Sequence, residues 1–357
     1  MTLVLSPGDS TLDELCTRLA DLAPTLDAAD AWPGEQLDLC AQAGVFQWFL
    51  SSEWGGQQWS EADLLRGYVK LAAACLTTTF VITQQMGAAG RIAASDNDWV
   101  KKALLPALVA GNTFATVGIS HLTTSRQHLD RPVLRAEETA AGFLLNGYSP
   151  WITGAEFAQH VVLGATLADR RQILVALPTD LAGVRVERSP QLVGLSASRT
   201  GPVHLDQVAV ERRWLLAGPV PEVMKHGTGA KTGGLQTSAL AIGLATAAIG
   251  YLQQQSRDRG NLTDPADALQ AERDALEADM LALAAGIAVC TNDELRTRAN
   301  SLALRASQAA LAAAKGAGYV VGHPAGRWCR EALFFLVWSC PQPVVSANLC
   351  ELAGLGT

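Results

Sequence analysis

The sequence predicts an α+β protein in three consecutive parts: an N-terminal helical domain, a central antiparallel β domain of barrel or sandwich form, and a C-terminal four-helix bundle. Leucines at helical spacing, short apolar runs separated by turn residues, and long Ala-rich segments follow one another along the chain. We expect the domains to span residues 1–111, 112–217 and 218–357.

The first domain is predicted to be helical because its apolar residues recur every three or four positions. Leu12, Leu15, Leu19 and Leu22 would lie on one face of a helix, and a second stripe follows at residues 64–72.

The second domain is predicted to consist of short strands. Its apolar runs are bounded by Gly, Asn, Asp and Ser, the residue types that form turns. These runs are Phe143–Leu145, Val161–Leu163, Ile173–Leu177 and Val208–Val210.

The third domain has helix-forming composition and many small residues, which allow helices to pack closely. We expect this bundle to be the core of a homo-oligomer as well. The predicted helices are Leu235–Ser256, Ala266–Ala288, Glu294–Ala314 and Arg327–Val337.

Composition excludes several classes of protein. With 49% apolar and 17% charged residues among 357, the chain is not disordered, and a net charge of −7 disfavours binding to nucleic acid or anionic lipid. The seven cysteines form no C-x-x-C pair, so we expect reduced thiols and no metal site. We expect no signal peptide and no membrane span, and therefore a cytoplasmic protein.

Several motifs resemble those of the acyl-CoA dehydrogenase family, in the family's order and over nearly the whole chain. Leu145–Ala155 (LNGYSPWITGA) and Gly194–Thr200 (GLSASRT) resemble its middle domain. The other matches are Glu53–Gly56 (EWGG), Gly316–Tyr319 (GAGY), His323–Pro324 and Arg330–Ala332 (REA).

The resemblance implies FAD bound between the β domain and the C-terminal helices of a dimer or tetramer. By position, Trp151 would pack beside the isoalloxazine, and Thr153 would offer its hydroxyl to the flavin N5 edge. Arg259 would reach a neighbouring subunit's FAD, and Gly316 and Gly318 would form a turn at the cofactor. Each residue also has a structural alternative. Trp151 could be a core residue and Thr153 an ordinary strand residue. Arg259 could be a solvated charge at a helix end, and the two glycines a helix C-cap.

The sequence departs from the family at its catalytic base. The glutamate of the usual Tyr-Glu-Gly-Thr-like run is replaced by Ser339, and the alternative base position near residues 233–234 also lacks a carboxylate. A positioned base is worth about 10²–10⁴ in rate. If a helix continued through Ser339, Glu331 and Glu351 would lie about 12 and 18 Å away along its axis.

A second departure lies at the start of the β domain, where the family carries Thr-Glu-Pro and Gly-Ser-Asp. By position, Ser120 would meet the cofactor, and Thr123, Ser125 and Arg126 the substrate. Histidine ordinarily has a pKa near neutrality, so His121 is the strongest candidate for a replacement base. The alternatives are a packed, hydrogen-bonded histidine and, for Arg126, a solvated loop charge.

Three functions stay open. The first is an FAD-dependent oxidoreductase acting on an acyl thioester of CoA or a carrier protein, with a relocated base such as His121. The second is a catalytically silent or accessory member, acting as a partner subunit of a heteromer or as an acyl binder. The third is a flavin monooxygenase, for which only His323 offers a C-terminal histidine. Ala312 stands where the family has a cofactor-binding glutamine. Glu53 and Glu156 are further carboxylates whose position relative to the site the sequence does not give. Residues 77–86 are expected to line the acyl pocket.

Overall fold

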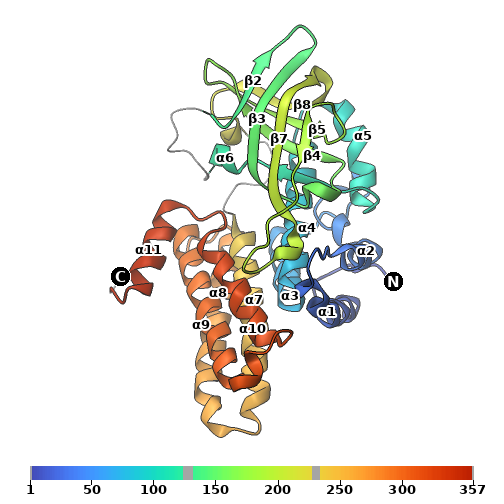
Figure 1. Cartoon of the computed structure of the whole chain (residues 1–357). Helices are drawn as coiled ribbons and strands as arrows, with labels where there is room; N and C mark the ends of the chain where they lie inside the picture. The colour runs from blue at the N-terminus through green and yellow to red at the C-terminus, as the bar shows by residue number, and fades with distance from the viewer. Residues whose placement is uncertain (1, 124–131, 227–233, 356–357) are drawn as a thin grey trace.

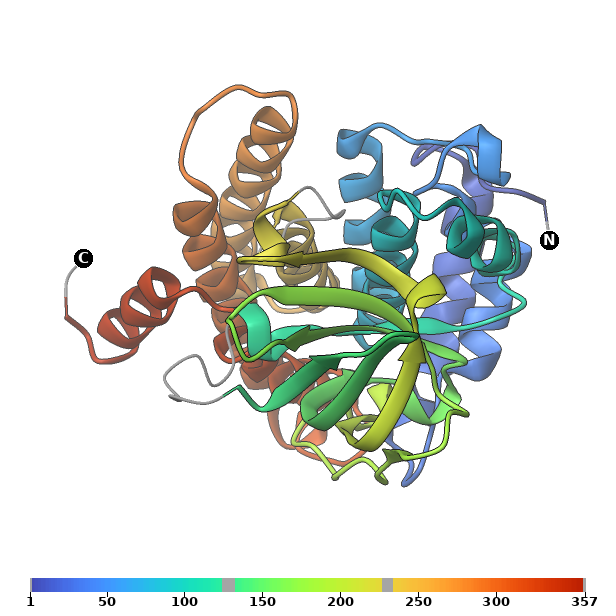
Figure 2. The same ribbon diagram turned by 90° about the horizontal axis from the view of Figure 1, so that it is seen from above.

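The computed structural model describes residues 2–123, 132–226 and 234–355. Helices of the N-terminal part and a helical bundle of the C-terminal part lie side by side beneath a twisted sheet (Figure 1). The same arrangement is visible from above, with the sheet in front of both helical parts (Figure 2). The three-part α+β fold predicted from the sequence is therefore confirmed.

The N-terminal helices are amphipathic, as their spacing predicts. Leu12, Leu15 and Leu19 of the first helix are fully buried. Ser60 and Asn97 cap two of the helices by accepting from backbone N–H groups. The helices are α1 (Ser10–Leu22), α2 (Gly34–Gln42), α3 (Glu61–Ala74), α4 (Leu76–Ala93) and α5 (Asp98–Val109).

One mixed sheet forms the centre, in the order β6-β7-β3-β2-β4-β5-β8, with β1 paired to β4. Most pairs are antiparallel as expected, but both β1 and β2 run parallel to β4. A short helix, α6 (Ser120–Thr123), follows β1. The strands are β1 (Ala115–Gly118), β2 (Leu134–Glu138), β3 (Gly142–Thr153), β4 (His160–Thr166), β5 (Gln172–Pro178), β6 (Val184–Val186), β7 (Thr200–Glu211) and β8 (Leu215–Val220).

Within the described residues 234–355, four helices form the C-terminal bundle, and a fifth packs on it. Close packing also joins the bundle to the N-terminal part, because a Cβ added at Gly243 would lie 2.7 Å from the carbonyl oxygen of Val69 in α3. The helices are α7 (Leu235–Ser256), α8 (Thr263–Ala284), α9 (Asn292–Gly318), α10 (Pro324–Ala332) and α11 (Gln342–Leu352).

Helix α7 is long and apolar enough to cross a membrane by length and composition, which the sequence expectation overlooked. Of its most apolar stretch, 72% is buried inside the protein. The helix contacts α3, α8 and α9, so packing within the fold accounts for its apolar composition.

Candidate functional site

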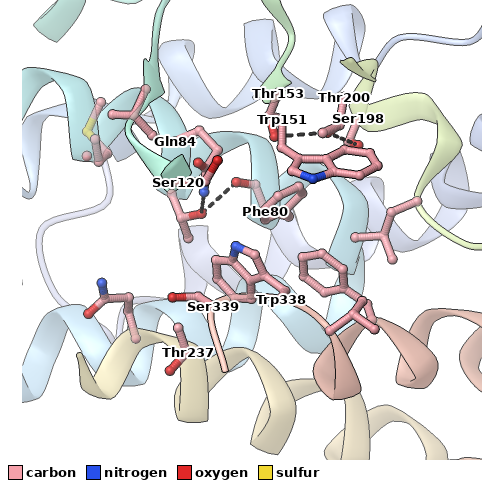
Figure 3. Close-up of a pocket in the computed structure, with 18 of the residues that line it drawn as sticks. Phe80, Gln84, Ser120, Trp151, Thr153, Ser198, Thr200, Thr237, Trp338 and Ser339 are labelled. Carbon is pink, nitrogen blue, oxygen red and sulfur yellow. Dashed lines mark hydrogen bonds between the residues drawn. The ribbon is translucent and has the colours of Figure 1, made fainter. Parts of the chain in front are cut away.

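A cavity of about 710 Å³ lies where the three parts of the fold meet. The sheet contributes one wall, helices α3 and α4 a second, and the start of α7 with the chain after α10 a third (Figure 3). Its lining is largely apolar, and polar side chains lie at separate points of it. This is the arrangement typical of a small-molecule site.

The sheet wall carries Trp151 and Thr153, two residues that the sequence singled out. Between Ser149 and Ile152 the register of β3 against β7 shifts by one residue, which is a β-bulge. The bulge places the Trp151 indole toward the cavity, where the residue is 50% exposed although its neighbour Ile152 is fully buried.

Next to the indole, three hydroxyls form a hydrogen-bonded row. Thr153 Oγ1 lies 2.9 Å from Thr200 Oγ1, which lies 2.8 Å from Ser198 Oγ. All three residues line the cavity, and Thr153 and Ser198 are buried. The row gives this wall polar groups that can both donate and accept.

The opposite wall contains Ser339 and an aromatic cluster (Figure 3). The predicted helix to Val337 is wrong: α10 ends at Ala332, a 3₁₀ turn covers Leu333–Leu336, and Ser339 adopts a left-handed φ of 48°. Because the chain is not helical there, the axial distances expected from Ser339 to the glutamates on either side do not apply.

Ser120 lines the cavity from α6, directly after β1. Its Oγ is buried and has no hydrogen-bond partner among the residues that the structure describes. Thr123 also lines the cavity. Ser125 and Arg126 lie outside the described residues.

His121 does not line the cavity, which is a correction to its assignment as replacement base. Its Nε2 lies 2.8 Å from the carbonyl oxygen of Gly164, so this nitrogen donates, and Nδ1 faces the hydroxyl of Ser149 at 3.5 Å. Burial lowers the pKa of the imidazole. The structure therefore shows a packed, hydrogen-bonded histidine rather than a base beside a substrate.

Among the described lining residues, the only carboxylate is Glu61, at the start of α3. Glu156 accepts from Arg199 and Ser189 outside the cavity, and Glu53 does not line it either. Because the cavity-facing position of Ser339 carries a hydroxyl, the described part of this wall supplies no carboxylate to take a proton.

Other residues singled out in the sequence lie outside the cavity. Arg259 donates to the carbonyl oxygen of Ala313 at 2.8 Å and to Gln255. Gly316 and Gly318 form the end of α9, and His323 caps α10 by accepting from a backbone N–H. These contacts are within the chain. The oligomer and the cytoplasmic location stay predictions.

The comparisons with known proteins agree with this geometry. The profile described as "Acyl-CoA dehydrogenase, N-terminal domain" matches residues 9–112. The chain therefore contains an N-terminal domain of the acyl-CoA dehydrogenase family. The probable acyl-CoA dehydrogenase YngJ of Bacillus subtilis is 23% identical over 262 residues, 71% of this chain and 68% of that protein.

Other proteins that are similar to this chain are also distant in sequence. Benzylmalonyl-CoA dehydrogenase of Aromatoleum aromaticum is 24% identical over 271 residues, again 71% of this chain and 68% of the relative. The structure of a glutaryl-coenzyme A dehydrogenase in complex with glutaryl-CoA superimposes with a TM-score of 0.81 at 18% identity, over 98% of this chain and 96% of that one.

Sequence reasoning missed part of the cavity wall. Phe80, Thr83, Gln84 and Met86 line it, within the expected range 77–86, but the rings of Phe334 and Trp338 were not singled out. The sequence does contain a signal for Trp338, because this residue directly precedes Ser339, the position at which the family carries its catalytic glutamate.

Proposed function

We propose that this protein is an FAD-dependent oxidoreductase that binds an acyl thioester in the cavity between Trp151 and Trp338. The observation that carries the proposal is the sheet wall, where a half-exposed indole lies beside a row of three hydroxyls. Three of the proteins that it resembles are named as acyl-CoA, benzylmalonyl-CoA and glutaryl-CoA dehydrogenases, which supports the substrate class.

The residues present fit a flavin. A large aromatic side chain exposed within a cavity can pack against a planar ring system. The Oγ of Ser120 has no hydrogen-bond partner among the described residues, and a buried hydroxyl usually has one. A ligand with polar edges placed against the sheet wall would give Ser120 a partner and meet the Thr153 hydroxyl.

In this mechanism the chain's own residues bind and orient. Bound FAD would supply a hydride acceptor. Trp151 would pack on its ring system, and Thr153, Thr200 and Ser198 would hydrogen-bond its polar edge. Phe80 and the other apolar lining residues would keep water from the acyl chain. Ser339 would offer the substrate a hydroxyl, which orients but does not take up a proton near neutral pH.

That last point favours a second candidate function. The described cavity wall has no carboxylate at the position of Ser339, so the chain could bind an acyl thioester without oxidising it. It would then be an accessory member of the family. The two candidates share the binding site and differ in whether bound thioester reduces the flavin.

Absorbance and anaerobic reduction test both. We expect the purified protein to take up FAD, visible in the oxidised-flavin band, and Trp151→Leu to weaken this uptake. Trp99→Leu is the control, because Trp99 is a surface residue of α5 outside the cavity. Wild-type protein that binds no FAD at 100-fold excess would refute the flavin proposal.

Acyl-CoA is then added without oxygen. Bleaching of the flavin band supports the oxidoreductase. A thioester that binds, seen as a shift of the band, without bleaching it over hours identifies the accessory function instead. Absence of any thioester effect contradicts both.

A further inference from the structure

The cavity is unusually rich in aromatic side chains. Six of the 31 described residues that line it are aromatic, about three times the 6% aromatic content of the whole chain. They are Phe49, Tyr68, Phe80, Trp151, Phe334 and Trp338. Apolar residues are expected around an acyl chain of any kind, but an excess of rings favours a ligand that interacts with rings.

Three of these rings form one ordered cluster, and its member Trp338 lies across the cavity from Trp151 (Figure 3). Phe334 and Trp338 are stacked, with centroids 4.9 Å apart and an interplanar angle of 15°. Phe80 meets both edge-on, with centroids at 4.7 and 5.0 Å and angles of 66° and 78°. Phe80 comes from α4 and the other two from the chain after α10, so two parts of the fold fix the cluster.

The position of the cluster in the cavity indicates that it would contact the acyl group rather than the flavin. The flavin wall proposed above is the sheet side, with Trp151, Thr153 and their hydroxyl partners. The cluster lies on the other side, and Trp338 is the neighbour in sequence of Ser339, the position at which the family handles the substrate. A group bound between the two walls would therefore contact the rings of Phe334 and Trp338.

We propose that the acyl group of the substrate carries an aromatic ring, which packs against the Phe80–Phe334–Trp338 cluster. The proposal rests on the proposed function, since it assumes that an acyl thioester enters this cavity. Aromatic rings have negative faces and positive edges, so a further ring gains a stacking or edge-to-face contact beyond the burial of its area. A saturated ring of the same shape gains the burial alone.

The experiment compares three CoA thioesters by calorimetric titration of the FAD-loaded protein. The probes are 3-phenylpropanoyl-CoA, 3-cyclohexylpropanoyl-CoA and nonanoyl-CoA, whose acyl groups have the same number of carbon atoms. We expect the phenyl compound to bind about two- to tenfold more tightly than the cyclohexyl compound. Equal affinity, or preference for either saturated compound, would overturn the proposal and leave the proposed function standing.

Variants locate the preference. Trp338→Leu and Phe334→Leu each remove one stacked ring and should reduce the phenyl-to-cyclohexyl ratio toward one. Trp99→Leu removes a tryptophan outside the cavity and should keep the ratio. A ratio unchanged in both cluster variants would contradict the assignment. Absence of binding by all three thioesters would refute it together with the substrate class of the proposed function.

Discussion

Glu331 is a carboxylate buried between two parts of the fold, and its ionisation should make the stability of the protein depend on pH. The residue lies in α10 and is 4% exposed. It accepts from the Thr77 hydroxyl of α4 at 3.5 Å and lies 3.9 Å from Nε of Arg327. Burial raises the pKa of the Glu331 carboxyl from 4.5 to about 7, and Arg327 opposes only part of this effect.

The size of the effect follows from the two pKa values. Because the folded protein binds the proton more tightly than the unfolded chain, this contribution to stability is complete below about pH 4.5. It is lost as the pH rises toward 7. Each pKa unit corresponds to about 1.36 kcal/mol, so the full loss amounts to about 3 kcal/mol.

Glu331→Gln removes the ionisation and keeps an acceptor for Thr77. Urea unfolding at pH 5 and pH 8 should show that the wild type loses about 2–3 kcal/mol relative to this variant. The charge interaction between Glu331 and Arg327 is already included in the folded pKa of about 7, so it needs no separate correction. Glu61→Gln, at an exposed carboxylate, is the matched control and should follow the wild type.

Parallel pH profiles of the wild type and Glu331→Gln would refute the reasoning. They would show that Glu331 ionises in the folded protein as readily as in the unfolded chain.

Three further substitutions test the site. Ser339→Glu should raise the rate of anaerobic flavin reduction by acyl-CoA by about 10²–10⁴, in stopped-flow absorbance, and an unchanged rate would contradict its position as the missing base. His121→Gln should leave that rate within about twofold, because the ring lies outside the cavity; loss of reduction would reinstate it as the base. Gly118→Ala would place a methyl 2.7 Å from Cδ1 of Leu163 and should cost about 1–3 kcal/mol in urea unfolding, whereas Gly90→Ala, with open space, should not.

Local patterns in the sequence predict the elements well because neighbouring residues determine them. The spacing of Leu12, Leu15 and Leu19 predicts a helix with one buried face, and this is what the structure shows. Residue type predicts chemistry less well. The ordinary pKa of histidine lies near neutrality, which suggests a catalytic base. Only the fold shows that the His121 ring donates a hydrogen bond to the backbone of β4.

The site depends on contacts between distant segments, and these leave no local signal. Phe80 and Phe334 are separated by 254 positions, and their ring contact exists only because α4 packs beside the chain that follows α10. The family resemblance identified Trp151, Thr153 and Ser339 as positions of interest. It did not show that an aromatic cluster faces them.

The extra residue in β3 determines which insertions or deletions the strand tolerates. Phe143 and Leu145 face the interior of the sheet domain from odd positions, whereas Ile152 does so from an even position after the bulge. Removing one amino acid at Pro150 would restore uniform alternation, with Ile152 still facing the interior and the Trp151 indole still on the opposite face. A single-residue deletion there should therefore leave the indole at the cavity and the ligand site in place.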